Sequence, residues 1–222
     1  EELMEKFFSG EAFTQEELQR GVKAGIKAGS ITPVFCGSST KLDCIDAMLH
    51  YMKHLMPSPA EAGAAQGENA DGEPIELACD AAGPLAVYAF KTVADPFVGK
   101  LSYVKVLSGV LKADSPVVNS RTGESERLGK LLFIRGKKQI DTDAICAGDI
   151  GAVTKLAATR TGDTLCAPGK IFKLPAPEFP VPTYSRALKV KQKNDEGKIS
   201  GAIARLIEED CTLSYKMNTE TL

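Results

Sequence analysis

The stretch from Asp95 to Val118, DPFVGKLSYVKVLSGVLKADSPVV, constrains the fold more than any other part of the sequence. Apolar, aromatic and β-branched residues gather at 101–107 and resume between 111 and 118, after a break at Ser108-Gly109. Such residues suit a half-buried pleated surface, whereas Pro and Gly mark places where the backbone needs special angles. The stretch therefore predicts two strands and the turns that connect them.

Further short apolar segments with turn signals continue to residue 175. Strands are expected at 85–94, 101–109, 117–119 and 126–134, with two more beginning near 150 and 161, and a basic loop at 135–138. Regularly spaced short strands favour a closed antiparallel barrel, because closure removes exposed sheet edges. We therefore expect a mainly β fold with a barrel over 84–175.

The flanking segments carry helical patterns. Helices are expected at 3–8, 16–28 and 43–56, with Thr14 and Glu17 in a capping-box pattern, and a short strand at 31–35. One strand cannot form a sheet, so residues 1–59 are expected to be the tail of a larger α/β domain. Residues 60–83, rich in Ala, Gly, Pro and acidic side chains, suggest a flexible linker. In 176–222 we expect a strand at 184–192, a helix from an Asp195 N-cap to Glu209, and a further strand at 210–215.

Charge is distributed unevenly along the 222 residues, whose formal net charge is −2. Residues 1–83 carry 6 Lys and Arg against 14 Asp and Glu, whereas residues 84–175 carry 14 against 8, a net charge of +6. A positive middle segment is consistent with a polyanionic partner such as RNA, because phosphates are attracted without reading of sequence. A lysine-rich solvated surface explains the same charge equally well.

Several classes of protein are disfavoured. No apolar run approaches the length of a membrane span, and the N-terminus has no signal-peptide pattern. The absence of an initiator Met suggests an excised fragment. Six scattered cysteines without a Cys-x-x-Cys pair favour reduced thiols in a cytosolic protein. His50 and His54 have helical i, i+4 spacing but no accompanying Glu or third ligand, so we expect no metal there.

Four segments of the barrel region read FKTVADPFVGKL at 90–101, SGVLKA at 108–113, AGDI at 147–150 and TGDTLC at 161–166. They resemble domain II of bacterial elongation factor G, a family of translational GTPases. EEDCT at 208–212 resembles the start of domain III, with Cys211 in place of the family's proline. The resemblance implies an antiparallel Greek-key β-barrel of the translation-factor type over 84–175. It also implies that 1–59 is a remnant of the α/β G domain and that 176–222 is half of a ferredoxin-like α+β domain.

PVFCGSSTK at 33–41 resembles the last guanine-recognition loop of the family's G domain, which implies that Ser38 and Ser39 lie beside guanine. The alternative is a plain strand-to-helix loop in which Ser38 or Thr40 caps the helix. No Gly-x-x-x-x-Gly-Lys-[Ser/Thr] or Asn-Lys-x-Asp motif occurs, so the phosphate-binding parts of a GTPase are missing. GTP or GDP and Mg²⁺ are therefore expected as cofactors of the parent protein only, and this chain alone is expected to need none and to hydrolyse no GTP.

Basic residues are expected to cluster around one hairpin of the barrel. As candidates for contact with rRNA phosphates the sequence offers Arg127, Lys130, Arg135, Lys137 and Lys138. Solvated surface charges are the alternative for each. The Arg-Gly-Lys form of the loop at 135–137 looks more like a paralogous elongation factor G-like group than a standard factor.

The resemblance implies a cytoplasmic parent that binds the ribosome, through small-subunit rRNA, and promotes GTP-dependent translocation of tRNA and mRNA. No membrane partner is expected. Two alternatives stay open. One is a ribosomal-protection or release-factor-like GTPase, and the other is a non-catalytic RNA- or protein-binding barrel complete in itself.

Overall fold

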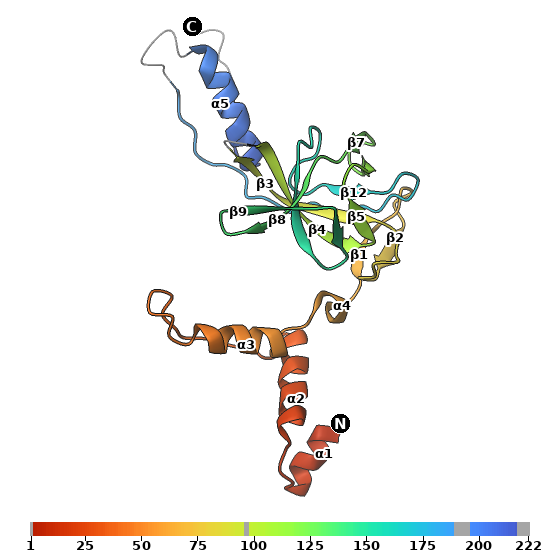
Figure 1. Ribbon diagram of the computed structural model, residues 1–222, viewed down its shortest axis with the longest axis vertical. Coiled ribbons are helices and arrows are strands. Elements are labelled where there is room, and N and C mark those ends of the chain that lie inside the picture. Colours follow the sequence, from red (N-terminus) through yellow and green to blue (C-terminus); the bar gives the residue numbers. More distant parts are fainter. Residues whose placement is uncertain (1, 96–97, 189–195, 217–222) are drawn as a thin grey trace. The chain divides into compact units, whose positions relative to one another are not determined.

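The computed structural model describes residues 2–95, 98–188 and 196–216 (Figure 1). The chain divides into two compact units, Glu1–Gly63 and Ala64–Leu222. No helix in the described part of the chain is long and apolar enough to cross a membrane.

The first unit is helical. Its elements are α1 (Glu2–Ser9), α2 (Gln15–Lys27), α3 (Ile45–Leu55) and α4 (Pro59–Ala62). The expected capping box is confirmed, since the Glu17 backbone N–H donates to Thr14 Oγ1 and the Thr14 N–H donates to the Glu17 carboxylate. Lys6 pairs with the same carboxylate at 2.8 Å and ties α1 to α2. None of the four helices buries a residue, so the described residues of this unit form no core of their own.

The strand expected at 31–35 is wrong, because residues 31–35 form neither helix nor strand. A strand is stable only with a hydrogen-bonded partner, and the described residues of the first unit provide none beside it. Ile31, Val34 and Phe35 are exposed as a result.

The second unit is built on one eight-stranded antiparallel sheet (Figure 1). Its strands lie in the order β7-β6-β12-β3-β4-β11-β8-β9. Their bounds are β3 (Ala86–Asp95), β4 (Gly99–Ser108), β6 (Pro116–Asn119), β7 (Ser125–Arg127), β8 (Leu131–Arg135), β9 (Lys138–Thr142), β11 (Ile150–Thr154) and β12 (Thr164–Cys166). A second, two-stranded sheet pairs β5 (Val110–Lys112) with β10 (Ala144–Cys146). The mainly β, antiparallel fold is confirmed, whereas closure between β7 and β9 stays a prediction.

Both sheets contribute to one apolar core. Alternate residues of β4 are fully buried, and the side chains they meet come from loops as well as strands. The core consists of Val87, Ala89, Val104, Val106, Leu111, Val117, Leu128, Leu131, Ile145, Val153, Leu156 and Leu165. Its members come from strands far apart in the sequence, so the sheet depends on long-range contacts for its stability.

The single strand expected at 126–134 is wrong. The structure divides it into β7 and β8, with Leu128 turned into the core between them. Gly129 approaches the neighbouring chain closely, since a Cβ atom there would lie 2.6 Å from the Thr154 carbonyl oxygen. The basic loop is also shorter than expected, because Arg135 and Lys138 are paired residues of β8 and β9.

The sequence predicts a flexible linker at 60–83, whereas the structure has two strands within this segment. Strands β1 (Ala65–Glu68) and β2 (Pro74–Leu77) form a hairpin, and the Glu68 N–H donates to the Lys173 carbonyl at 2.9 Å. Ile75 and Leu77 pack with Phe172 against the sheet. The domain boundaries at 59/60, 83/84 and 175/176 stay predictions.

Helix α5 (Glu196–Glu209) follows the sheet and packs on β3 (Figure 1). The Ala94 N–H donates to Glu209 Oε1 at 2.6 Å, which fixes the last turn of α5 at the end of β3. The strand expected at 184–192 is absent through residue 188, and its remainder lies outside the described residues, as does the Asp195 N-cap. Residues 210–215 form a turn followed by chain without regular secondary structure, rather than the expected strand.

Candidate functional site

The predicted guanine loop is held by contacts within itself. The Ser38 N–H donates to the Asp43 carbonyl at 3.1 Å, and the Lys41 N–H lies 3.3 Å from Ser38 Oγ. Ser39 is exposed. Cys44, at φ 60°, precedes α3 without a side-chain capping bond, so the alternative of Ser38 or Thr40 as the cap is wrong. The contact of Ser38 and Ser39 with guanine stays a prediction.

The structure brings together three of the five basic candidates. Arg135, Lys137 and Lys138 are exposed at the tip of the β8–β9 hairpin, where Arg135 and Lys138 lie directly opposite each other. The tip therefore presents three positive charges at one end of the sheet order.

The other two candidates lie elsewhere. Lys130 is five residues before Arg135, about 17 Å along an extended strand, and pairs with Asp141 at 3.0 Å on an exposed surface. Arg127 lies on β7, opposite Pro116, at the other end of the sheet order. The expected cluster of five around one hairpin is therefore wrong for Arg127. Contact of any of them with rRNA stays a prediction.

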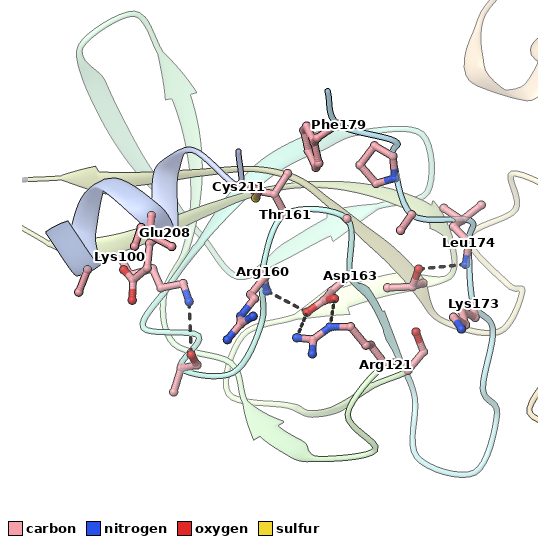
Figure 2. Close-up of a pocket in the computed structure, with 18 residues that line it drawn as sticks. Lys100, Arg121, Arg160, Thr161, Asp163, Lys173, Leu174, Phe179, Glu208 and Cys211 are labelled. Carbon is pink, nitrogen blue, oxygen red and sulfur yellow. Dashed lines mark hydrogen bonds and ion pairs between the residues drawn. The ribbon is translucent and has the colours of Figure 1, made fainter. Parts of the chain in front are cut away.

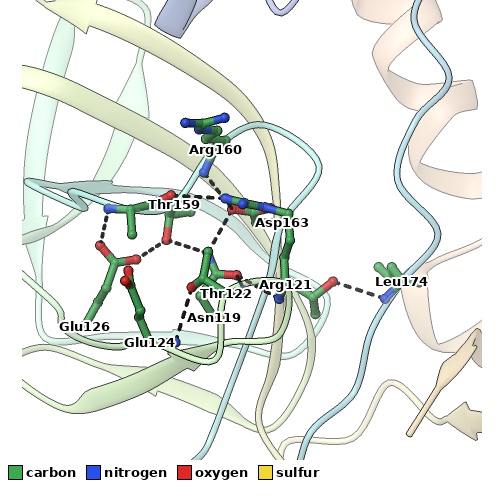
Figure 3. Close-up of polar contacts among 11 residues, drawn as sticks. Asn119, Arg121, Thr122, Glu124, Glu126, Thr159, Arg160, Asp163 and Leu174 are labelled. Carbon is green, nitrogen blue, oxygen red and sulfur yellow. Dashed lines mark hydrogen bonds and ion pairs between the residues drawn. The ribbon is translucent and has the colours of Figure 1, made fainter. Parts of the chain in front are cut away.

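A polar network that sequence reasoning did not identify is centred on the buried carboxylate of Asp163 (Figure 3). Arg121 donates to it through Nε at 2.6 Å and Nη2 at 2.9 Å. The Asn119 amide donates at 2.8 Å and the Arg160 backbone N–H also donates at 2.8 Å. One carboxylate thus joins the turn after β6 to the loop that precedes β12.

Fully buried Asn119 and Thr159 extend this network. Asn119 Oδ1 accepts from the Arg121 N–H at 2.9 Å and so shapes the turn. Glu126 of β7 accepts from the Thr159 hydroxyl and, at 2.8 Å, from the Ala158 N–H. The buried polar side chains of this cluster therefore have the partners that burial requires.

The pKa of Asp163 is lowered from its ordinary value. Burial, the largest single influence, raises it, but hydrogen bonds from Arg121, Asn119 and the Arg160 N–H together more than offset burial. The same contact with Asp163 raises the pKa of Arg121. The pair is therefore ionised at neutral pH.

A pocket of about 770 Å³ opens beside this network (Figure 2). Its walls come from the loop at 157–164, the segment 173–179 and the last turns of α5. Figure 2 shows Lys100 and Glu208 at one end of the view and Lys173 and Leu174 at the other. Residues of the barrel region and of the segment after it thus share one concave surface, all within the second unit.

The walls combine positive charge with apolar surface. Lys100, Arg160 and Lys173 supply cations against the carboxylate of Glu208, whereas Arg121 and Asp163 neutralise each other. Leu174, Pro177, Phe179 and Ile207 supply the apolar part. Such a surface suits a ligand that carries both an anionic group and a flat or apolar body.

Other reactive groups do not assemble into a site. In the described part of the chain, no group of three or more His, Cys, Asp or Glu is arranged to hold a metal ion. The rings of His50 and His54 lie 4.4 Å apart on α3. All six cysteines are free thiols, and burial raises the pKa of Cys166.

Sequence reasoning found the strands around the pocket and missed the pocket itself. The one signal in the sequence is the TGDTLC segment at 161–166, which contains Asp163. Asn119 and Asp163 are 44 residues apart, so their contact follows from the pairing of β6 with β12 and not from any local motif.

The second unit thus combines an antiparallel β module with helix α5, which packs on β3. Family comparisons identify both. The model of elongation factor G domain 2 matches residues 84–168, and that of elongation factor G domain III matches residues 179–222. The chain therefore belongs to the elongation factor G family.

Among solved structures, the crystal structure of a protein from Thermus thermophilus is similar over 100% of this chain. The TM-score is 0.75 and the sequence identity 26%. The chain spans 31% of the length of that protein. The similarity supports the fold over both units.

Proposed function

We propose that this chain is part of a translational GTPase that binds the ribosome and promotes GTP-dependent translocation of tRNA and mRNA. The observation that carries the proposal is the presence of domain 2 and domain III of the elongation factor G family in consecutive order. The activity belongs to a longer parent protein, located in the cytoplasm, in which the phosphates of GTP or GDP and the Mg²⁺ ion bind to other segments.

Within that parent, the barrel acts as a docking module for small-subunit rRNA. The net charge of +6 over residues 84–175 supports this role, because neutralised phosphates release counterions and favour binding. The three exposed cations at the β8–β9 tip supply contacts to RNA phosphates, and such contacts do not depend on the base sequence.

Pre-translocation ribosomes provide the test. The parent protein is added with GTP, and movement of the mRNA is followed by fluorescence of a label at its 3′ end, while ribosome-stimulated release of phosphate is measured in parallel. We expect both signals. Stimulated hydrolysis without mRNA movement would support a ribosomal-protection or release-factor-like role instead. Absence of ribosome binding would favour the non-catalytic barrel.

A further inference from the structure

We propose that the pocket between the 157–164 loop and α5 binds one unstacked nucleotide of a single-stranded RNA segment, with its phosphate at Arg160 and its base against Phe179. This site is separate from the β8–β9 tip. It depends neither on GTP hydrolysis nor on translocation, so it goes beyond the function proposed above.

The size and position of the pocket suit such a ligand. About 770 Å³ lies within the range of roughly 300–1,000 Å³ usual for small-molecule and cofactor sites. The walls come from five parts of the chain, which include the 161–163 turn and, on α5, Ala204 and Ile207. A single base with its sugar and phosphate therefore fits, whereas a duplex does not.

The charges of the pocket select an anion. Because Arg121 is engaged by Asp163, it adds no net charge. Three cations then face one carboxylate, that of Glu208. Lys100 Nζ donates to the Ala157 carbonyl at 3.3 Å and is held at the wall.

Arg160 is the best placed phosphate ligand. Its backbone N–H is fixed by Asp163, yet its guanidinium has no hydrogen-bond or ion-pair partner among the described residues. A positioned guanidinium with free donors matches the geometry of a phosphate group. The network around Asp163 therefore prepares Arg160 without occupying its side chain.

The apolar wall selects a flat ring. Phe179 is 45% exposed although it lines the pocket, and Pro177 and Leu174 adjoin it in the same segment. Bases stack on exposed aromatic rings irrespective of sequence. By contrast, the β8–β9 tip has the sequence Arg-Gly-Lys-Lys and no aromatic residue. It can therefore bind the phosphate backbone of RNA, but it offers no ring on which a base could stack.

The test uses the complete chain and two fluorescein-labelled strands, an oligoadenylate RNA and the same strand with abasic sites, titrated by fluorescence anisotropy at several salt concentrations. We expect the strand with bases to bind about tenfold more tightly than the abasic one. Phe179→Leu should remove most of this difference. Arg160→Gln should reduce the slope of log affinity against log salt by about 0.7, the contribution of one phosphate on a single strand.

Lys112→Gln is the matched control, because it removes one exposed positive charge from β5, outside the pocket. It should leave the difference between the two strands unchanged. Thermal unfolding of each variant checks that the fold is intact. Equal affinity of the native chain for both strands, or an undiminished difference in a folded Phe179→Leu protein, would overturn the proposal. AMP that competes as effectively as the strand, per nucleotide, would overturn the assignment to RNA.

Discussion

At the scale of single residues, Asp163 has the most consequences in this molecule. Its carboxylate accepts four hydrogen bonds from three residues that belong to two separate segments. Removing it would leave the buried Asn119 amide without its best partner. Unsatisfied buried donors typically cost about 1–3 kcal/mol each, so this position is expected to be sensitive.

Asp163→Asn should lower the free energy of unfolding by about 2 kcal/mol at pH 7, because charge-assisted bonds from Arg121 are lost. Since the folded-state pKa of Asp163 is depressed, its contribution is complete above the unfolded value near 3.8 and is lost as pH falls through the folded value. The difference in free energy of unfolding between the native chain and the variant should therefore be constant at neutral pH and shrink below about pH 4.

Urea unfolding at pH 7 and at progressively lower pH measures that gap. Asp143→Asn serves as the control, because Asp143 is exposed and should change stability little at any pH. A gap that persists undiminished in acid would contradict the role assigned to the Asp163 carboxylate.

Gly162 shows how backbone geometry shapes the pocket. It has φ +96°, and a Cβ atom there would lie 2.8 Å from Pro177 Cδ. Gly162→Ala should therefore destabilise the fold by about 1–3 kcal/mol and displace the 176–177 segment. Gly169→Ala isolates the conformational part, since Gly169 has φ +79° with open space around it. Chemical denaturation of both variants should show the larger loss of unfolding free energy for Gly162→Ala. Equal losses would mean that Pro177 moves aside without a measurable loss of stability.

At the scale of elements, the β8–β9 hairpin is the part of the sheet best suited to a polyanion. It is the end hairpin of the strand order, and every residue of β9 except Thr142 is exposed. Its Lys130–Asp141 pair is more than two-thirds exposed on both sides, so we expect it to contribute little to stability. The tip residues are therefore free to be changed without loss of the fold.

Replacing Arg135, Lys137 and Lys138 with alanine in the parent protein should weaken ribosome binding and make its salt dependence shallower, because fewer phosphates are neutralised. Barrel stability should change by only a few tenths of a kcal/mol. Fluorescence titration against ribosomes at several salt concentrations measures the slope. Arg127→Ala, at the other end of the sheet order, shows whether the hairpin alone is responsible. An unaltered slope in the triple variant would remove the hairpin from the interface.

Elements with a strong local pattern could be predicted from the sequence, and those fixed by distant contacts could not. The Thr14–Glu17 box and the helix ending at Glu209 are local, and both were found. The break at Gly129 depends on the Thr154 carbonyl, and the β1–β2 hairpin depends on Phe172, which lies far along the chain. The candidate site has the same character, since the pocket collects residues from Lys100 to Cys211.

At the scale of the whole molecule, the second unit holds the only large core found in the described residues. We expect residues 84–175 to unfold cooperatively as an isolated polypeptide, because the largest core cluster draws its buried side chains from strands along this whole span. A polypeptide of residues 64–175 should be about 2 kcal/mol more stable, since the β1–β2 hairpin covers Phe172. Thermal and urea unfolding compare the two. If the shorter polypeptide shows no cooperative transition, residues 84–175 are not an autonomous barrel.

The last prediction concerns GTP binding and hydrolysis by this chain alone and by its parent protein. A GTPase needs a loop that cradles the phosphates, a lysine on the β- and γ-phosphates and a ligand for Mg²⁺. The sequence has no Gly-x-x-x-x-Gly-Lys-[Ser/Thr] or Asn-Lys-x-Asp motif, and the loop at Ser38 offers at most one side of a guanine site. Contacts to guanine alone would leave the triphosphate in solvent.

The chain alone should therefore release no phosphate from GTP above the uncatalysed rate, and its melting temperature should not rise with micromolar GTP or GDP in the presence of Mg²⁺. Phosphate release and thermal unfolding measure the two effects, with the parent protein as the positive control. Ser38→Ala should change neither result in the isolated chain, yet should weaken GDP binding in the parent if that loop lies beside guanine. Stabilisation of the isolated chain by micromolar nucleotide would show that guanine recognition is complete within these 222 residues.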